Sequence, residues 1–314
     1  MSNVCKTPLL IIGSGPAGYS AAIYAARASL SPVLVSGYEQ GGQLMLTTSV
    51  ENYPGFANPI GGPRLMQAMK SQVSNLDCRI IEDQIVGLKI SKSPFHLTGE
   101  SGDEYIAKSI IIATGAQAKW LNIPSERKYL GYGVSSCATC DAPFFKNKLV
   151  AVIGGGNTAV EEAIYLTKYA KKVFLIHRRD HLRADKILQD RFVNNKKIIP
   201  IWSTILEEIQ GSENPKSVKR VVLKNLNSNT RQSIDIDGVF IAIGHTPNTS
   251  LFKDQINMDS DGYIVTRPNS TVTSVSGIFA SGDVQDKIFR QAITAAGTGC
   301  MAALEASSFL AGCC

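Results

Sequence analysis

Two stretches of this chain repeat the same order of apolar and polar positions. In the first, residues 9–12 are apolar and lead into a glycine-rich loop, residues 16–28 are rich in alanine and apolar at helical spacing, and residues 32–35 are again mainly apolar. Short apolar runs bounded by glycine predict buried strands, and the alanine-rich segment predicts a helix. This stretch is therefore expected to form a strand, a loop, a helix and a second strand.

The second copy lies about half the chain length further on. Residues 149–153 are apolar and lead into another glycine loop, a helix is predicted from there to about Tyr169, and residues 172–176 predict the next strand. Two further apolar runs, residues 109–115 and 238–244, also end in glycine. A repeat at this separation is too long for a solenoid, and it indicates a duplicated unit.

The order of these segments predicts an α/β fold with two Rossmann-like nucleotide-binding domains, the second inserted into the first. The inserted domain is expected at residues 118–246, so that residues 1–117 and 247–314 form one discontinuous domain. The apolar runs that end in glycine would return the chain to the crossing points. Residues 116–119 and 244–248 are therefore the predicted hinges.

Composition narrows the class of protein. The 314 residues are 44% hydrophobic and 18% charged, which is typical of a soluble α/β protein. The net charge of +6 would attract an acidic partner, but no run of Lys and Arg is long enough to predict a nucleic-acid site. No apolar stretch approaches the length of a membrane span, and the first residues lack the pattern of a secretion signal. We expect a cytoplasmic protein that binds neither nucleic acid nor membrane.

The two glycine loops predict two nucleotide sites. They read Gly13-Ser14-Gly15-Pro16-Ala17-Gly18 and Gly154-Gly155-Gly156-Asn157-Thr158-Ala159. In such loops glycine permits a tight turn and lets the backbone approach a pyrophosphate, which lies against the positive end of the following helix. One loop alone is weak evidence. Two copies, each after a predicted strand and before a predicted helix, strongly predict dinucleotide binding.

The nucleotide of the second site follows from the end of its second strand. Arg178 and Arg179 stand there, with Arg183 one turn further on, in place of the carboxylate that would bind a ribose 2′-hydroxyl. Guanidinium groups bind phosphate in a bidentate way, so they suit a 2′-phosphate. The alternative is a solvated run of charges. The pattern favours NADPH over NADH.

The first site carries different polar residues. Glu39 follows its second strand and could bind a ribose hydroxyl. Near the C-terminus an apolar run leads into Gly282-Asp283, and an Asp at a strand end could accept a hydrogen bond from the ribityl chain of FAD. A simple tight turn is the alternative for that dipeptide.

Cys137 and Cys140 form the only C-x-x-C pair among seven cysteines. Between two nucleotide sites, such a pair predicts redox chemistry, with electrons passing from nucleotide to nucleotide to disulfide. One alternative is a zinc site with His177 and His181, but 36 residues separate Cys140 from His177, far more than a zinc-finger loop uses. The other alternative is a pair of inert buried thiols.

The residues around the pair refine the redox hypothesis. Polar residues before it and Pro143 after it predict a helix start, where the helix dipole lowers a thiol pKa. Asp141, next to the second cysteine, is expected to supply or remove protons. The C-terminal pair Cys313-Cys314 is either a second thiol relay or an incidental feature of the tail.

Further segments complete a joint pattern with the glycine loops and the C-A-T-C-D motif. They are Glu39-Gln40-Gly41-Gly42-Gln43-Leu44, Val50-Glu51-Asn52-Tyr53-Pro54-Gly55, Ala113-Thr114-Gly115-Ala116, His177-Arg178-Arg179-Asp180, Gly244-His245-Thr246-Pro247-Asn248, and Gly282-Asp283-Val284 with Arg290-Gln291-Ala292. The pattern resembles that of the bacterial-type, low-molecular-weight thioredoxin reductases over essentially the whole chain. The C-terminal cysteine pair is not part of it.

The resemblance implies an NADPH-dependent thioredoxin-disulfide reductase that is a homodimer without metal. Electrons would pass from NADPH to FAD, then to the disulfide and, after domain rotation, to thioredoxin. The implied catalytic residues are Cys137, Cys140 and Asp141. The implied FAD residues are Gly13, Gly15, Pro16, Ala17, Glu39, Gln40, Gly41, Gly42, Gln43, Asn52, Ala113, Thr114, Gly115, Gly282, Asp283, Arg290, Gln291 and Ala292. The implied NADPH residues are Gly156, Asn157, Thr158, His177, Arg178, Arg179 and Arg183.

Two other functions stay open. The same fold could send electrons to another acceptor, such as a glutaredoxin-like protein, a peroxiredoxin-linked domain or a ferredoxin, although the C-A-T-C-D motif disfavours a ferredoxin. The chain could also be a non-catalytic flavin-binding redox sensor whose disulfide reports the state of NADPH to a partner. Rapid steady turnover with a small dithiol protein would argue against a sensor.

Overall fold

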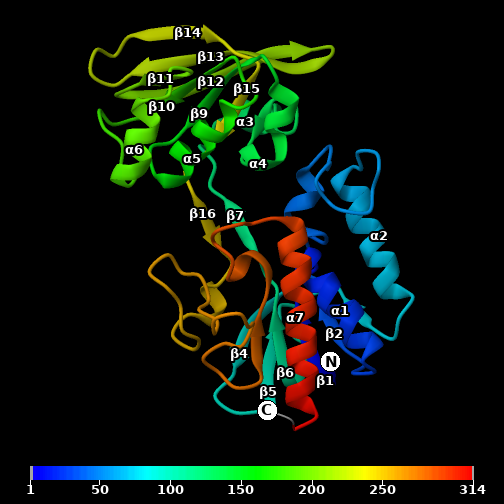
Figure 1. Ribbon diagram of the computed structural model, residues 1–314. Helices are drawn as coiled ribbons and strands as arrows, with labels where there is room; N and C mark the ends of the chain where they lie inside the picture. The colour runs from blue at the N-terminus through cyan, green and yellow to red at the C-terminus, as the bar shows by residue number, and fades with distance from the viewer. Residues whose placement is uncertain (1–2, 313–314) are drawn as a thin grey trace. The chain divides into compact units, whose positions relative to one another are not determined.

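The computed structural model describes residues 3–312 and divides into two compact units (Figure 1). Unit 1 consists of Met1–Gln117 and Thr246–Cys314, and unit 2 of Ala118–His245. The chain passes between the units through two short strands, β7 (Ala116–Ala118) and β16 (His245–Pro247), which pair with each other. The two crossings therefore run together rather than at separate places.

Unit 1 is built on a parallel sheet extended by an antiparallel hairpin. The central strand β1 pairs with β2 on one side and β6 on the other, with Leu10 opposite both Val33 and Ile110. Such central strands are buried on both faces, which explains their continuous apolar runs. The strand order is β3-β2-β1-β6-β5-β4, and β17 pairs with the second half of β6. The bounds are β1 Val4–Ile12, β2 Val33–Val35, β3 Arg79–Ile81, β4 Ile85–Lys89, β5 Phe95–Gly99, β6 Glu104–Ile112 and β17 Ile278–Ala280.

Helices cover this sheet, and two of them pack unusually closely. Helix α1 meets α7 where a Cβ on Gly299 would lie 2.2 Å from the carbonyl oxygen of Ala17, and the Ser20 hydroxyl donates to the carbonyl of Ala296 at 2.6 Å. Leu9 and Ile11 of β1 pack into the core beneath these helices, while alternate residues of β1 pack into a second core. The helices are α1 Pro16–Arg27, α2 Gly62–Ser74 and α7 Ala292–Leu310, with short 3₁₀ helices η1 Gly42–Leu46, η3 Ser250–Phe252 and η4 Gly282–Val284.

Unit 2 combines a parallel sheet with a separate antiparallel one. The parallel sheet has the order β11-β10-β9-β15-β8, and the antiparallel sheet the order β12-β13-β14. Ala151 of β9 and Val221 of β13 belong to one buried cluster, which joins the two sheets. The strands are β8 Val134–Ser135, β9 Leu149–Ile153, β10 Lys172–Ile176, β11 Ile198–Ile201, β12 Thr204–Glu213, β13 Lys216–Asn225, β14 Arg231–Asp235 and β15 Gly238–Ile241; the helices are α3 Pro124–Lys128, α4 Ala138–Asp141, α5 Asn157–Leu166 and α6 Lys186–Val193, with η2 Ala142–Phe145.

The predicted α/β class and the repeated strand, loop and helix are confirmed. The predicted strands at residues 149–153 and 172–176 form with those bounds as β9 and β10. The helix predicted to reach about Tyr169 ends earlier, at Leu166, because the next amides donate to carbonyls three residues back and the Thr167 hydroxyl donates to the carbonyl of Ile164 at 2.6 Å. Such tight final turns are common at helix ends.

Helix α7 is the longest apolar helix of unit 1, with 19 residues. Across residues 3–312, no helix combines the length and the apolar character that a membrane span requires.

Candidate redox and nucleotide sites

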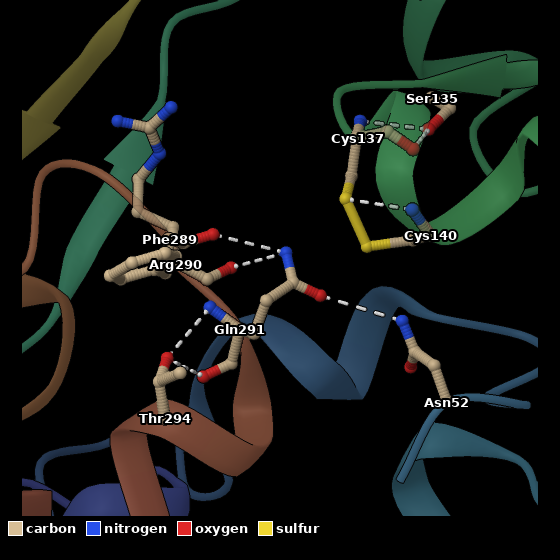
Figure 2. Close-up of a disulfide and its surroundings, with 8 residues drawn as sticks. All are labelled: Asn52, Ser135, Cys137, Cys140, Phe289, Arg290, Gln291 and Thr294. Atoms are coloured by element: carbon tan, nitrogen blue, oxygen red, sulfur yellow. Dashed lines mark hydrogen bonds between the residues drawn. A yellow bond between two sulfur atoms is a disulfide. The ribbon is translucent and has the colours of Figure 1, made fainter. Parts of the chain in front are cut away.

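The two cysteines of the C-x-x-C motif form a disulfide (Figure 2). Cys137 is the N-cap of α4, and its sulfur accepts a hydrogen bond from the amide of Cys140 at 3.2 Å. The predicted helix start is therefore confirmed. Helix α4 has only four residues before a 3₁₀ helix follows, so few peptide dipoles are aligned toward the sulfurs. Both cysteines are partly exposed, which a disulfide that exchanges with another protein requires.

A serine that the sequence reasoning did not assign holds this motif in place. The hydroxyl of Ser135 accepts a hydrogen bond from the amide of Cys137 at 3.0 Å (Figure 2). Burial raises the pKa of Asp141, and a hydrogen bond with the same Ser135 acts in the opposite direction. The carboxyl of Asp141 thus keeps its proton to higher pH than an ordinary aspartic acid, which suits a proton donor beside the disulfide.

The two glycine loops have the same internal geometry. Gly13 has φ +112°, and a Cβ there would lie 2.3 Å from the carbonyl oxygen of Ala113, just beyond β6. In unit 2, Gly154 has φ +152°, and a Cβ would lie 2.3 Å from the carbonyl oxygen of Ala242, just beyond β15. Only glycine fits both the backbone conformation and the contact. The repeat seen in the sequence thus extends to the third strand of each unit.

Both loops are shaped to receive a pyrophosphate. The N-cap residues of α1 and α5 are Gly15 and Gly156, neither helix has a side-chain cap within the described part of the chain, and open space lies where each glycine would carry a Cβ. The first amides of a helix lack partners within the helix, and together with the helix dipole they attract an anion. The residues present therefore fit a bound dinucleotide in each unit. Pro16 and Ala17 open α1, and Thr158 lies in the first turn of α5.

Further predicted residues of unit 1 lie beside its glycine loop. A Cβ on Gly42 would come 3.5 Å from the α-carbon of Gly15, and the amide of Gly41 donates to the Ser14 hydroxyl at 3.2 Å. Gln43 lies in the same 3₁₀ helix, and Glu39, just before it, is exposed. Ser14 had not been assigned a role; here it ties the loop to the segment that contains the predicted flavin residues.

The predicted flavin residue Gln40 is fixed by two charged neighbours. Its amide oxygen accepts a hydrogen bond from the ammonium group of Lys70 at 2.6 Å, and its amide nitrogen donates to a carboxylate oxygen of Glu82 at 2.9 Å. Lys70 lies in α2, thirty residues further along the chain. These two bonds fix the orientation of the Gln40 amide group. No pattern in the sequence indicates that Gln40, Lys70 and Glu82 meet.

The C-terminal predicted residues meet one residue from the first part of the chain (Figure 2). Gln291 is the N-cap of α7, and its amide oxygen accepts a hydrogen bond from Asn52 at 3.4 Å. Ala292 is the first residue of that helix. Burial, with the negative charge of Asp286, raises the pKa of Asp283 to about 7, and Arg290 acts in the opposite direction. The structure thus brings Asn52, Asp283, Arg290 and Gln291 into one unit.

Gly282 adopts a conformation that favours glycine. Its φ is +73°, and its amide donates to the Thr298 hydroxyl at 2.9 Å. The preceding Ser281 has a buried hydroxyl without a hydrogen-bond partner among residues 3–312. An orphaned buried hydroxyl beside a predicted flavin residue is consistent with a ligand that the site is built to hold.

Ala113, Thr114 and Gly115, which are also predicted to bind the flavin nucleotide, lie next to β7, where the chain passes between the units. The Thr114 hydroxyl donates to the carbonyl of Asn248 at 2.8 Å, and the Asn248 side chain donates back to the carbonyl of Thr114 at 2.8 Å. The amide of Asn248 also donates to the carbonyl of Gly115 at 2.9 Å. On the unit 2 side, the amide of Lys119 donates to the carbonyl of Gly244. In each unit, hydrogen bonds therefore join the segment that leaves the unit to the segment that returns to it. A hinge at these segments stays a prediction.

The predicted 2′-phosphate site keeps its three arginines available. Arg178, Arg179 and Arg183 are exposed, and among residues 3–312 none of them pairs with a carboxylate. The neighbouring Asp180 instead accepts a hydrogen bond from His181 at 2.6 Å. Three unpaired guanidinium groups at the end of β10 can attract a phosphate dianion.

His177 and Asn157 have roles that the sequence did not specify. Burial, followed by the charges of the three arginines, lowers the pKa of His177, so its ring is neutral, and the ring Nε2 is buried without a partner in the described residues. The Asn157 side chain forms two hydrogen bonds with Asp185, at 2.7 and 2.9 Å, and the amide of Arg183 donates to the carbonyl of Gly155 at 2.7 Å. These contacts hold the segment with Arg183 and Asp185 against the second glycine loop.

The other cysteines give less information. Cys5 in β1, Cys300 in α7 and Cys78, just before β3, are free thiols in different parts of unit 1, as expected for scattered structural cysteines. The predicted relay or incidental pair Cys313-Cys314 lies outside the described residues. With the sulfurs of Cys137 and Cys140 bonded to each other, the structure favours the redox interpretation of that pair over a zinc site or two free thiols.

Comparisons with known proteins agree across both units. The family described as pyridine nucleotide-disulphide oxidoreductase matches residues 7–299. A thioredoxin reductase of Rickettsia conorii is 58% identical over 304 residues, which are 97% of this chain and 98% of the relative. Solved structures of a thioredoxin reductase from Giardia duodenalis (TM-score 0.94, 39% identity) and of one from Streptococcus pyogenes (TM-score 0.93, 42% identity) are also similar, and each covers 98% of this chain and 99% of its own.

Proposed function

This chain belongs to the pyridine nucleotide-disulphide oxidoreductase family, and within it to the thioredoxin reductases, so we propose that it reduces the disulfide of a thioredoxin with electrons from NADPH. The observation that carries the proposal is the partly exposed Cys137–Cys140 disulfide, in the same unit as the second glycine loop. A redox disulfide is the group that a dithiol protein substrate needs to meet.

We assign FAD to unit 1 and NADPH to unit 2. In unit 1 the Gly13 loop, the Gln40–Gln43 segment, Asn52 and the residues around Asp283 and Arg290 would hold the flavin nucleotide. In unit 2 the Gly156 end of α5 would hold the pyrophosphate, and the three arginines after β10 a 2′-phosphate. The unpaired guanidinium groups support NADPH over NADH. The units so defined correspond to the two Rossmann-like domains, the second inserted into the first.

The bound flavin would accept a hydride from NADPH and pass the electron pair to the disulfide. Reduction of Cys137–Cys140 to two thiols takes two electrons and two protons; NADPH supplies the hydride and the medium one proton. Asp141, whose pKa is raised by burial, is placed to hand a proton to a departing thiolate. The dithiol then exchanges with the disulfide of thioredoxin through a mixed disulfide. We propose that the units rotate about the β7 and β16 crossings during this cycle.

We also propose that the protein is a homodimer, through the exposed face of α7. Ile293, Met301 and Leu304 are 43%, 37% and 54% exposed at helical spacing, and Gly297 leaves a gap between them. The only charged residue of α7 is Glu305, whose carboxylate is occupied by Ser270 and Thr271. An uncharged, apolar helix face with a small residue at its centre suits a second copy of itself.

The dimer proposal is tested by sedimentation velocity. Leu304→Glu should shift the protein to a monomer, while Val265→Glu, at another exposed apolar position of unit 1, should leave the dimer intact. A wild-type protein that sediments as a monomer at micromolar concentration would overturn this part of the proposal. The odd number of cysteines, with a single C-x-x-C among them, supports a reducing compartment, and we propose that the enzyme works in the cytoplasm.

The reductase activity is tested by anaerobic oxidation of NADPH or NADH by the FAD-loaded protein, with and without thioredoxin. We expect thioredoxin-dependent turnover that prefers NADPH. Cys137→Ser and Cys140→Ser should each keep flavin reduction by NADPH and lose thioredoxin reduction. Flavin reduction without turnover would point to another acceptor or to a sensor, and unchanged turnover in both serine variants would refute the proposed electron path.

A further inference from the structure

The segment that precedes α7, residues 286–291, is held in one conformation from within. One carboxylate oxygen of Asp286 accepts hydrogen bonds from the amides of Ile288 and Phe289 at 3.0 and 2.9 Å, and the other accepts from the amide of Arg290 at 3.3 Å. The Arg290 side chain in turn donates to the carbonyl of Lys287. The segment is thus a closed loop organised around one carboxylate.

This conformation has a cost at Arg290. Its φ is +46°, in the left-handed region that a non-glycine residue enters at a cost of about 1 kcal/mol. Residues keep such a conformation only where their surroundings over-determine it, and they gather at functional sites. Gln291 follows directly, and its amide nitrogen donates to the carbonyls of Phe289 and Arg290, both at 3.1 Å (Figure 2). The orientations of Arg290 and Gln291 are therefore coupled.

A turn elsewhere in unit 1 anchors this loop from outside. The ammonium group of Lys287 lies 2.6 Å from a carboxylate oxygen of Asp259 and 3.2 Å from one of Asp261. The other oxygen of Asp259 accepts hydrogen bonds from the amides of Asp261 and Tyr263 at 2.9 and 3.0 Å. The turn thus holds the carboxylate of Asp259 in place independently of Lys287. The Asp259 side chain is only 24% exposed, so this ion pair is shielded better than an ordinary surface pair.

The same turn makes a second contact with the loop. Tyr263 is buried, and its phenol lies near the side chain of Arg290, whose positive charge opposes the rise in the phenol pKa that burial causes. The next residue, Ile264, donates its amide to the carbonyl of Val284 at 3.0 Å, just before the loop begins. The turn therefore contacts the loop at Lys287 and at Arg290, and the residue that follows the turn pairs with the chain just ahead of the loop.

We propose that the turn at residues 259–263 is a positioning element for the flavin site, which fixes Arg290 and Gln291 in their binding conformation through Lys287 and Tyr263. This inference rests on the proposed function, which assigns those two residues to FAD. A binding segment that is already ordered does not lose conformational entropy when the ligand binds, so pre-organisation raises affinity. Asp259, Asp261, Tyr263 and Lys287 are positioning residues in this scheme, not catalytic ones.

The test measures FAD binding to the apoprotein by quenching of flavin fluorescence. Lys287→Met should weaken FAD binding 3- to 10-fold, whereas Lys287→Arg, which keeps the charge, should bind within 2-fold of wild type. Lys253→Met is the matched control, because Lys253 is exposed and has no ion pair in the described part of the chain. Asp259→Asn combined with Lys287→Met should bind no more weakly than Lys287→Met alone, since both changes remove the same contact.

Two further readouts separate positioning from general destabilisation. Hydrogen exchange of amides 288–291 should be faster in the Lys287→Met apoprotein, while its urea midpoint stays close to that of Lys253→Met. Tyr263→Phe should weaken FAD binding without faster exchange at the Lys287 end of the loop.

Two results would overturn the inference: Lys287→Met and Lys253→Met binding FAD equally well, or a loss of affinity that parallels a loss of apoprotein stability in every variant. Wild-type apoprotein that binds no FAD would instead refute the proposed function, so the two failures are distinguishable.

Discussion

The imidazole ring of His177 lies directly against the α-carbon of Gly155: a Cβ on that glycine would come within 2.4 Å of the ring Cε1. The ring also packs edge-on to Trp202, with 6.4 Å between centroids, so it has little room to move. Gly155 is therefore required by the packing of the chain itself, whereas its neighbour Gly156 faces open space. The two glycines of one loop serve different purposes.

Gly155→Ala should damage both stability and nucleotide binding. The added methyl group has to displace a packed ring, which costs roughly 1–3 kcal/mol. Gly156→Ala should leave the urea midpoint of the apoprotein unchanged and weaken NADPH binding, because its methyl group enters the space expected for the pyrophosphate. FAD content should be normal in both. His177→Ala should restore stability to Gly155→Ala by removing the obstacle. Equal midpoints for the two alanine variants would show that the ring yields freely.

Nucleotide preference should depend on the arginines after β10. Arg178→Ala combined with Arg183→Ala should lower kcat/KM for NADPH about 10- to 100-fold, since a hydrogen bond to a charged group contributes about 1.5–3 kcal/mol. The value for NADH should change little, because NADH has no 2′-phosphate. Lys172→Met, which removes an exposed charge at the start of β10, is the control. A parallel loss with both nucleotides would mean that the arginines stabilise the loop rather than read the phosphate.

The sequence was most informative where a residue type has one physical purpose. Gly13 and Gly154 could be assigned from the strand before them and the helix after them, and both have the positive φ and the carbonyl contact that exclude a side chain. The strands β9 and β10 were predicted because strands buried on both faces are continuously apolar. The C-x-x-C helix start was predicted from its polar and proline neighbours. Each of these signals is local, because all the residues that form it lie within one short segment.

Other parts of the site depend on which distant segments meet. Lys70 binds the side chain of Gln40, thirty residues away in the chain, and no pattern in either segment predicts this contact. The antiparallel sheet of unit 2 was missed for a different reason: register shifts between Leu206 and Glu208 and between Gln210 and Gly211 interrupt the two-residue period by which a strand is recognised. Ser135 was treated only as a polar residue before a helix, although it contacts both Cys137 and Asp141.

The proposed role of Asp141 as a proton donor predicts a pH dependence. Because burial raises its pKa, the carboxyl is protonated over a wider range, and the rate of thioredoxin reduction should fall as rising pH removes that proton. Asp141→Asn should lose this limb of the pH profile and lower the rate about 100- to 10,000-fold, the usual contribution of a general acid. Flavin reduction by NADPH, measured by rapid mixing, should stay at the wild-type rate. A variant that keeps the wild-type pH profile would assign the limb to another group.

Asp283 predicts a dependence of stability on pH. Burial is the main reason that its pKa lies at about 7 in the folded protein, against about 3.9 for an unfolded aspartic acid. Between these values the folded state keeps a proton that the unfolded state has released, so stability falls as pH rises from about 4 to about 7. Over the whole window the loss is of the order of 4 kcal/mol, before screening by solvent.

The measurement is urea unfolding of the apoprotein at pH 5 and pH 8. Asp283→Asn cannot ionise, so the decrease of the midpoint between these two pH values should be smaller in this variant than in wild type. Asp254→Asn, at an exposed position, should behave as wild type. At pH 8 the Asp283→Asn apoprotein should be the more stable of the two, because wild type then has to bury a charged carboxylate or pay to protonate it. The same pH dependence in both would mean that Asp283 is ionised in the folded apoprotein, with Arg290 compensating its charge.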